Sequence, residues 1–382
     1  MIAFIWQNDW EALAFSFVRR LADVGHEVSF FARGMQRDEG ALEAALPAGV
    51  RRASSLAAAV KQAEVVLTLL SSPQEVEDVY LGEGGVLEKA APASRFIDLS
   101  TSSPRLAKEL NALAAVHDHS FIEAPLEGGV IGGESGADDA AAGGAAPAAV
   151  TPTLQADALR ILAAGEPADI ESALPLLRVL TPQVIVAGLP GSAVALKLAS
   201  QIGLAGALMG VIEAITFAKV SGVADEHIFE VVSQSAAASE VSRVFGKKVL
   251  SEDFSSGPML RLFFNDLASA LEAADELELA LPGLETAHQL YDLLVLVGGG
   301  PKGIHALALI YYDEVRCAQH GLNWELAQRA MDVYERAGDN YDDYDYDYDD
   351  EDCDDPNCNH PHHHHSDGDD KPPSMSGFFS SN

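Results

Sequence analysis

Short apolar runs alternate with helical patterns through the first half of the chain. The spacing of Leu13, Phe17 and Leu21 predicts a helix over 11–24 that ends at Gly25. Strands are predicted at 2–5, 28–31, 65–70, 95–98, 121–124, 161–164 and 184–187. Strands that alternate with helices are typical of a parallel sheet with helices on both faces.

From residue 193 onward the pattern is helical throughout. Helices are predicted at 193–220, 225–235, 239–250, 259–279, 283–297, 303–320 and 324–337. The sequence therefore predicts an α/β fold, in which a Rossmann-type, doubly wound parallel sheet over 1–190 is followed by an all-helical domain over 191–337.

Two segments depart from this rhythm. Residues 140–150 are rich in Ala, Gly and Pro and have no period, which predicts a mobile insertion over 138–157. The tail over 338–382 holds 14 acidic residues and one basic residue, Lys371, and is predicted to be disordered. This tail carries −13 of the formal net charge of −34, and the body carries the remaining −21.

Because the body is acidic as well, binding to nucleic acid or to an anionic membrane surface is disfavoured. Met1 leads directly into a strand without a basic leader, and cysteines are few, so a cytoplasmic location is expected. Cys353, Cys358 and His360 in the tail are weak metal candidates. Their spacing matches no closed structural zinc pattern, so no metal site is predicted.

Three features recur in an order and spacing typical of one enzyme family. They are the sequence DLSTSSP at 98–104, the sequence EAPLEGG at 123–129, and Lys197 at the start of a long apolar helix. Together they resemble the β-hydroxyacid dehydrogenase family, which includes 3-hydroxyisobutyrate dehydrogenase. The resemblance implies a helical domain like the C-terminal domain of 6-phosphogluconate dehydrogenase, a homodimer built on the long helix, and a small-molecule substrate.

The resemblance implies an acid/base role for Lys197, which would exchange a proton with the substrate hydroxyl. The alternative is a lysine that starts a helix and reaches solvent. Ser100, with Thr101 beside it, would contact a substrate carboxylate. A helix cap is the alternative for Ser100, but Ser102 or Ser103 suits that cap better, because Pro104 fits a first helical position.

Other predicted site residues follow from the same resemblance. Gly128 and Gly129 match a carboxylate-binding turn, but Glu127 stands where the family has Ser. Glu127 is either an acid/base group or a turn residue that faces solvent. Gln201 lies on the helical face of Lys197, and Asp266 matches the acid of the family's Lys-Asp-Leu sequence.

The predicted dinucleotide turn has lost its glycines. A Gly-x-Gly-x-x-Gly turn lets the backbone approach a pyrophosphate at a helix N-terminus. Here Trp6, Asn8 and Glu11 replace the three glycines, and Asp9 adds a second carboxylate. Trp6 is large where the family leaves little room. The sequence therefore predicts weakened pyrophosphate binding.

Other residues at the predicted cofactor cleft remain suitable. Arg33 follows the second strand, where it is placed to meet the 2′-phosphate of NADP, although a surface arginine is the alternative. Gln7, Asn8, Leu70 and Ser71 complete the predicted cofactor contacts. NADP is the predicted cofactor, and binding of no cofactor is the alternative.

Three functions remain open from the sequence. The first is an NADP-linked oxidoreductase with an altered phosphate grip that acts on a small hydroxy or oxo compound. The second is a redox-silent relative, an isomerase, lyase or cyclase that uses Lys197 for acid/base chemistry without NAD(P). The third is a non-catalytic dimeric scaffold.

Overall fold

The computed structural model describes residues 1–34, 46–128, 159–255 and 260–329. The predicted insertion over 138–157, the tail over 338–382 with Cys353, Cys358 and His360, and Gly129 lie outside the described residues.

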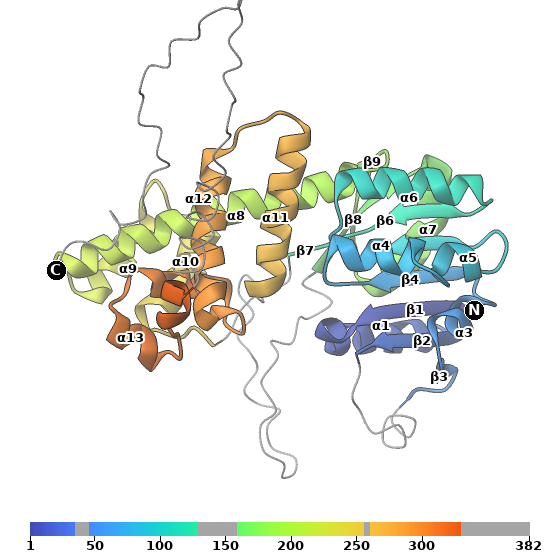
Figure 1. Cartoon of the computed structure of the whole chain (residues 1–382), viewed down its shortest axis with the longest axis horizontal. Helices are drawn as coiled ribbons and strands as arrows, with labels where there is room; N and C mark the ends of the chain where they lie inside the picture. The colour runs from blue at the N-terminus through green and yellow to red at the C-terminus, as the bar shows by residue number, and fades with distance from the viewer. Residues whose placement is uncertain (35–45, 129–158, 256–259, 330–382) are drawn as a thin grey trace, which may run out of the picture. The chain divides into compact units, whose positions relative to one another are not determined.

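The first half folds as a Rossmann-type sheet, as predicted (Figure 1). Its strands are β1 (Ile2–Gln7), β2 (Val28–Arg33), β3 (Val50–Arg52), β4 (Val65–Leu69), β5 (Arg95–Asp98), β6 (Ser120–Glu123), β7 (Leu126–Gly128), β8 (Leu159–Gly165) and β9 (Gln183–Gly188). The strands β3-β2-β1-β4-β5-β6 are parallel throughout. The chain adds β2 and β3 on one side of β1 and then adds β4, β5 and β6 on its other side, so the strand order reverses between β1 and β4. Ligands of open α/β sheets bind at such a reversal, outside the carboxyl ends of the strands.

The far side of the sheet differs from the parallel prediction. Strand β8 pairs antiparallel with both β6 and β7, and parallel with β9. β7 was not predicted, because Leu126–Gly128 is too short to show any period. The sheet is therefore dominated by parallel pairs and has an antiparallel corner beside Gly128.

Helices cover both faces of the sheet. They are α1 (Glu11–Asp23), α3 (Leu56–Val60), α4 (Pro73–Leu81), α5 (Val86–Lys89), α6 (Pro104–Val116) and α7 (Pro167–Leu180). Alternate residues of β1 divide between two cores: Phe4 and Trp6 pack with α1 and α7, whereas Ala3 and Ile5 pack with α3, α4 and α6. This alternation places the Trp6 side chain inside the α1 and α7 layer.

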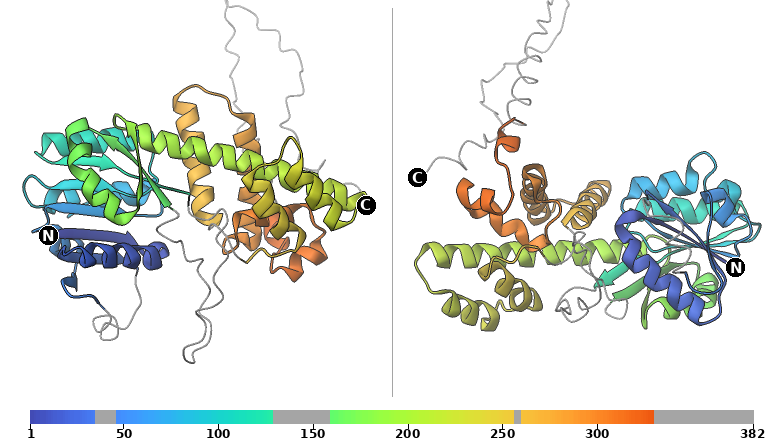
Figure 2. Two further views of the ribbon diagram at one scale, coloured as in Figure 1. Left: turned by 180° about the vertical axis from the view of Figure 1, so that it is seen from behind. Right: turned by 90° about the horizontal axis from the view of Figure 1, so that it is seen from below.

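From residue 192 to 329 the described regular structure is helical. The helices are α8 (Ser192–Val220), α9 (Asp225–Gln234), α10 (Glu240–Leu250), α11 (Leu260–Glu276), α12 (Pro282–Leu294) and α13 (Glu314–Gln319). Figure 2 shows α8 as one uninterrupted helix in two further views. The predicted helix over 303–320 is wrong as one element. A 3-10 helix, Ile304–Tyr311, precedes α13, and the Asp313 side chain caps α13 by accepting from the Arg316 N–H.

Among the described residues, α8 has the length and apolar composition to cross a membrane, and 39% of its apolar 18-residue stretch is buried in the fold. The core helix of a soluble protein passes the same test. The buried residues of α8, among them Leu198, Leu208 and Ile212, contribute to the core of the helical half. The length and composition of α8 are therefore weak grounds for a membrane span.

Candidate active site

Polar side chains lie in a row across the carboxyl ends of three neighbouring strands. Thr68 of β4 lies opposite Asp98 of β5, which lies opposite Glu123 of β6. The Thr68 hydroxyl donates to Asp98 Oδ1 at 2.8 Å, and the Ser100 hydroxyl donates to the same oxygen. Burial raises the pKa of Asp98 to about 6, although these donors oppose the shift. The centre of the sheet edge is therefore a buried, hydrogen-bonded carboxyl group.

Ser100 is part of this network rather than open to solvent. Its hydroxyl donates to Asp98 and accepts the Leu70 N–H at 2.8 Å, and the residue is 1% exposed. The hydroxyl proton of Ser100 is thus already donated to Asp98. The predicted contact of Ser100 with a substrate carboxylate stays a prediction. Of the two predicted caps, Ser102 and Ser103, the structure has Ser103, which caps α6 by accepting the Leu106 N–H.

Lys197 is buried beside a carboxylate. It lies in the second turn of α8, is 8% exposed, and its Nζ lies 3.8 Å from Asp266 Oδ2 of α11. The Thr101 side chain hydrogen-bonds to the same carboxylate. Burial raises the pKa of Asp266 to about 6, although Lys197 and Thr101 oppose the rise. The alternative of a lysine that reaches solvent does not fit this placement, because the side chain is enclosed.

Gln201 and Glu127 lie in different surroundings. Gln201, one turn beyond Lys197, is also 8% exposed. Glu127 pairs with Arg160 at 2.9 Å, directly opposite it in the β7–β8 register, and accepts from the Ser200 hydroxyl at 3.1 Å. Arg160 therefore compensates the charge that the sequence placed beside the predicted carboxylate turn. Gly128 ends β7 with φ of 84°, a backbone conformation that favours glycine.

The β1–α1 turn is bridged to the loop that follows β4. A 3-10 turn, Asn8–Trp10, leads into α1. The Trp10 Nε1–H donates to the Leu70 carbonyl at 3.2 Å, and the Ser71 hydroxyl donates to Asp9 Oδ2 at 3.2 Å. Side chains thus connect the two loops that flank the reversal point of the sheet.

Asn265 adds a third connection to this loop. Its Nδ2–H donates to the Ser71 carbonyl at 3.0 Å, so α11 contacts the loop one residue before Asp266. By the resemblance, Asn265 matches the lysine of the Lys-Asp-Leu sequence, and here its amide reaches a backbone oxygen. The β4–α4 loop thereby becomes a meeting point of the β1–α1 turn and α11.

Trp6, which is large for a glycine position of the predicted turn, lies in an aromatic core. Its indole is fully buried and stacks on Phe30 with ring centres 4.8 Å apart, and it meets Phe4 and Phe15 edge to face. Because position 6 points into the α1 and α7 layer, the bulk of the indole is absorbed by an aromatic core. The change at the first glycine position therefore adds packing to the sheet rather than filling the cleft.

The remaining predicted cofactor residues lie at the same edge. Gln7 ends β1 and lies opposite Arg33, which ends β2, and both are half-buried. Asn8 is exposed. The structure thus brings Gln7, Asn8 and Arg33 to one end of the sheet, and Leu70 and Ser71 to the next loop.

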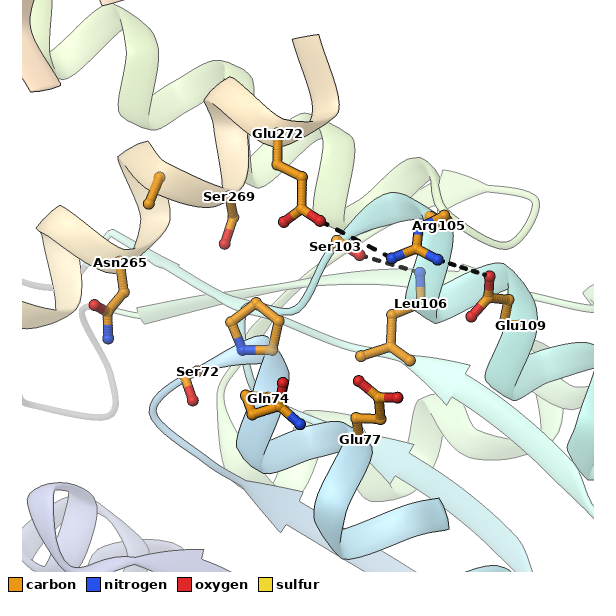
Figure 3. Close-up of a pocket in the computed structure, with 12 residues that line it drawn as sticks. Ser72, Gln74, Glu77, Ser103, Arg105, Leu106, Glu109, Asn265, Ser269 and Glu272 are labelled. Carbon is orange, nitrogen blue, oxygen red and sulfur yellow. Dashed lines mark hydrogen bonds and ion pairs between the residues drawn. The ribbon is translucent and has the colours of Figure 1, made fainter. Parts of the chain in front are cut away.

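A pocket of about 380 Å³ lies beside Asn265, between the first turns of α4 and α6 and the surface of α11 (Figure 3). Its wall carries the carboxylates of Glu77, Glu109 and Glu272, and Arg105, which pairs with Glu109 and lies 3.9 Å from Glu272. Neither Lys197 nor Asp266 lines it. The Lys197–Asp266 pair and this acidic pocket are therefore separate features of the structure.

The sequence did not reveal the contribution of three residues to this site. Asp98 and Glu123 belong to the two sequence motifs, but their burial was not predicted, although each ends a buried strand. Arg160 gave no local signal, because its partner Glu127 lies 33 positions earlier and only strand pairing brings them together.

Two protein-family models match the chain. Residues 15–158 match the NAD binding domain of 6-phosphogluconate dehydrogenase. Residues 191–311 match the NAD-binding domain of NADP-dependent 3-hydroxyisobutyrate dehydrogenase. The first match begins after the altered turn at residues 6–11.

Several proteins are similar over most of the chain. A probable 3-hydroxyisobutyrate dehydrogenase-like protein of Arabidopsis thaliana is 29% identical over 76% of this chain and 79% of its own length. The 2-hydroxy-3-oxopropionate reductase of Escherichia coli is 25% identical over 75% of this chain and 89% of its own. The structure of 3-hydroxyisobutyrate dehydrogenase from Mycobacterium tuberculosis with L-serine covers 81% of this chain and 98% of its own, with a TM-score of 0.64 and 23% identity, which supports the fold.

Proposed function

The chain belongs to the β-hydroxyacid dehydrogenase family, and from this premise we propose that it is an NADP-linked oxidoreductase acting on a small hydroxy or oxo compound. The observation that carries the proposal is the buried Lys197–Asp266 pair at 3.8 Å. A buried amine beside a carboxylate is suited to exchange a proton with a substrate hydroxyl.

The proton path follows from this pair. In the oxidative direction the Lys197 amine accepts the proton of the substrate hydroxyl, while the carbon that bears this hydroxyl gives up a hydride. The Asp266 carboxylate, ionised above about pH 6, stabilises the ammonium that forms. In the reductive direction the same ammonium returns the proton to the carbonyl oxygen. A nicotinamide dinucleotide, when bound, supplies the hydride acceptor or donor.

The residues of the β1–α1 turn do not fit a pyrophosphate in the usual manner. Asp9 and Glu11 place acidic groups in the first helical turns, where free amides and the helix dipole otherwise attract phosphate. Arg33, at the end of β2, suits a 2′-phosphate, because its guanidinium can form charge-assisted hydrogen bonds. We therefore propose a grip that depends on the 2′-phosphate more than on the pyrophosphate.

Binding and turnover test this proposal separately. NADPH and NADH are titrated by energy transfer from protein tryptophans to the nicotinamide. Turnover is then followed by the absorbance of the reduced nicotinamide at 340 nm. The substrates are 3-hydroxyisobutyrate for oxidation and 2-hydroxy-3-oxopropionate for reduction, which appear in the names of two similar proteins. We expect tighter binding of NADPH than of NADH and turnover that depends on Lys197. Absence of NADPH binding at millimolar concentration would refute the proposal.

The redox-silent alternative is not favoured, because both matching family models describe NAD-binding domains. It would regain support only if turnover proceeded in nucleotide-free buffer. The scaffold alternative would require that Lys197→Met leave every cellular phenotype unchanged.

We also propose a homodimer that pairs through α8. Leu196 and Phe217 are 45% and 77% exposed on this helix. Between them Gly203, Gly206 and Gly210 have open space where a side chain would stand, so a second helix could approach closely. A cytoplasmic location remains a prediction from the sequence.

A further inference from the structure

The first turn of α8 is capped by a carboxylate from another element. Gly191, the N-cap residue, has φ of 90° and no side chain to offer. Instead Glu123, at the end of β6, accepts the Ala193 N–H at 2.8 Å, and the Gly191 and Val194 amides help to oppose the rise in its pKa that burial causes. A carboxylate at this position satisfies amides that the helix leaves open and interacts favourably with the helix dipole.

Glu123 is enclosed with the helix start around it. The residue is 2% exposed, and it belongs to the strand next to Asp98. A side chain at Gly191 would come within 3.0 Å of the Pro104 carbonyl and 2.6 Å of the Lys108 side chain. The start of α8 is therefore held between the sheet edge and the first turn of α6.

This arrangement fixes where Lys197 lies. Lys197 follows Ala193 by four residues, so both lie on the same buried face of α8, one turn apart. We infer that Glu123 is a positioning residue, which caps α8 from the sheet and thereby holds the Lys197 amine at Asp266. This inference rests on the proposed acid/base role of Lys197, but the placement of the amine can be measured without cofactor or substrate.

The test compares three variants of the full chain. Glu123→Ala removes the acceptor, Glu123→Gln keeps an acceptor oxygen, and Glu166→Ala is the matched control. Glu166 is an exposed glutamate at the N-terminus of α7 whose side chain makes no cap hydrogen bond. Acetylation of Lys197 by succinimidyl acetate is measured by peptide mass spectrometry, relative to the exposed Lys61, together with hydrogen exchange over 191–197.

We expect Glu123→Ala to raise relative Lys197 acetylation at least fivefold and to increase exchange in the first turn of α8. Glu123→Gln should stay within twofold of wild type, and Glu166→Ala should change neither. A folded Glu123→Ala protein with unchanged acetylation would overturn the inference. If that variant does not fold, Glu123→Met, which is similar in volume without an acceptor, is judged by the same criteria. If acetylation changes as expected but Lys197→Met retains full turnover, the proposed function fails while the positioning role stands.

Discussion

Restoring glycine at position 6 should destabilise the protein rather than repair its cofactor turn. Trp6 is fully buried against three phenylalanines, with Phe30 stacked at 4.8 Å and Phe4 and Phe15 edge to face at 5.2 and 5.3 Å. Truncation of a buried Trp to Ala costs about 3–5 kcal/mol, and each favourable ring pair contributes about 0.5–1.5 kcal/mol beyond buried area. We expect Trp6→Ala to lower the free energy of unfolding by about 4–5 kcal/mol.

Two further substitutions separate ring packing from backbone and hydrogen-bonding effects. Trp6→Gly should cost about 0.5–1 kcal/mol more than Trp6→Ala, because glycine weakens a strand interior. Trp6→Phe should cost less than about 1.5 kcal/mol. Among the described residues the buried indole Nε1–H has no hydrogen-bond partner, so its removal relieves a penalty of about 1–3 kcal/mol that partly offsets the lost volume.

Urea unfolding followed by far-ultraviolet circular dichroism measures this series. Val116→Ala, at an apolar side chain that is 78% exposed at the end of α6, is the control and should change stability by less than about 0.5 kcal/mol. A loss below about 1.5 kcal/mol for Trp6→Ala would contradict the packing described for β1. So would tighter NADPH binding by a fully folded Trp6→Gly protein.

Four further outcomes are expected. Lys197→Met should lower kcat by about 10²–10⁴-fold while NADPH binding persists, as measured by steady-state rates and fluorescence titration. Since burial raises the pKa of Asp266 to about 6, kcat should fall as pH decreases through 6, where the carboxylate becomes protonated and no longer pairs with Lys197; a pH–rate profile tests this. Arg33→Ala should weaken NADPH binding by about tenfold and leave NADH binding unchanged, as measured by titration. Phe217→Glu should convert a dimer into a monomer in light scattering coupled to size-exclusion chromatography.

Each of these outcomes has a control or a result that would contradict it. Asp266→Asn should remove the inflection near pH 6, and its persistence would assign that inflection to another group. Arg19→Ala, an exposed change on α1, should leave NADPH binding unaltered. Equal losses for NADPH and NADH in Arg33→Ala would argue against contact with a 2′-phosphate. A monomeric wild type would remove the dimer proposal, and unchanged kcat in Lys197→Met would remove the proton path.

The order of strands and helices could be predicted because it follows from periodicity, which is local. The runs at Ile2–Gln7 and Val28–Arg33 are apolar and bounded by turns, and the helix Glu11–Asp23 has a regular apolar face. Strand β3, helix α3 and strand β7 are three to five residues long, too short for a period to appear. Their formation depends on partners that only the folded sheet supplies.

The site could be predicted in part for the same reason. Lys197 was identified from its place in a long apolar helix, and Asp266 from a short motif. Their contact joins residues 69 positions apart and depends on how α8 and α11 pack. Residue type alone did not reveal the surroundings of Trp6 and Glu127, because these depend on which face of a strand each residue occupies. Pairing partners such as Phe30 and Arg160 then decide whether bulk or charge is tolerated.

The length of α8 has a mechanical consequence. A continuous helix of 29 residues is about 43 Å long, at about 1.5 Å per residue. If it pivots at its distal end, each degree of tilt displaces the opposite end by about 0.7 Å. Misplacement of a reacting group by about 1 Å can cost about a hundredfold in rate. A substitution near Phe217, at the end of α8, could therefore displace Lys197 near its start. Such a substitution would slow the reaction without changing any residue that contacts the substrate.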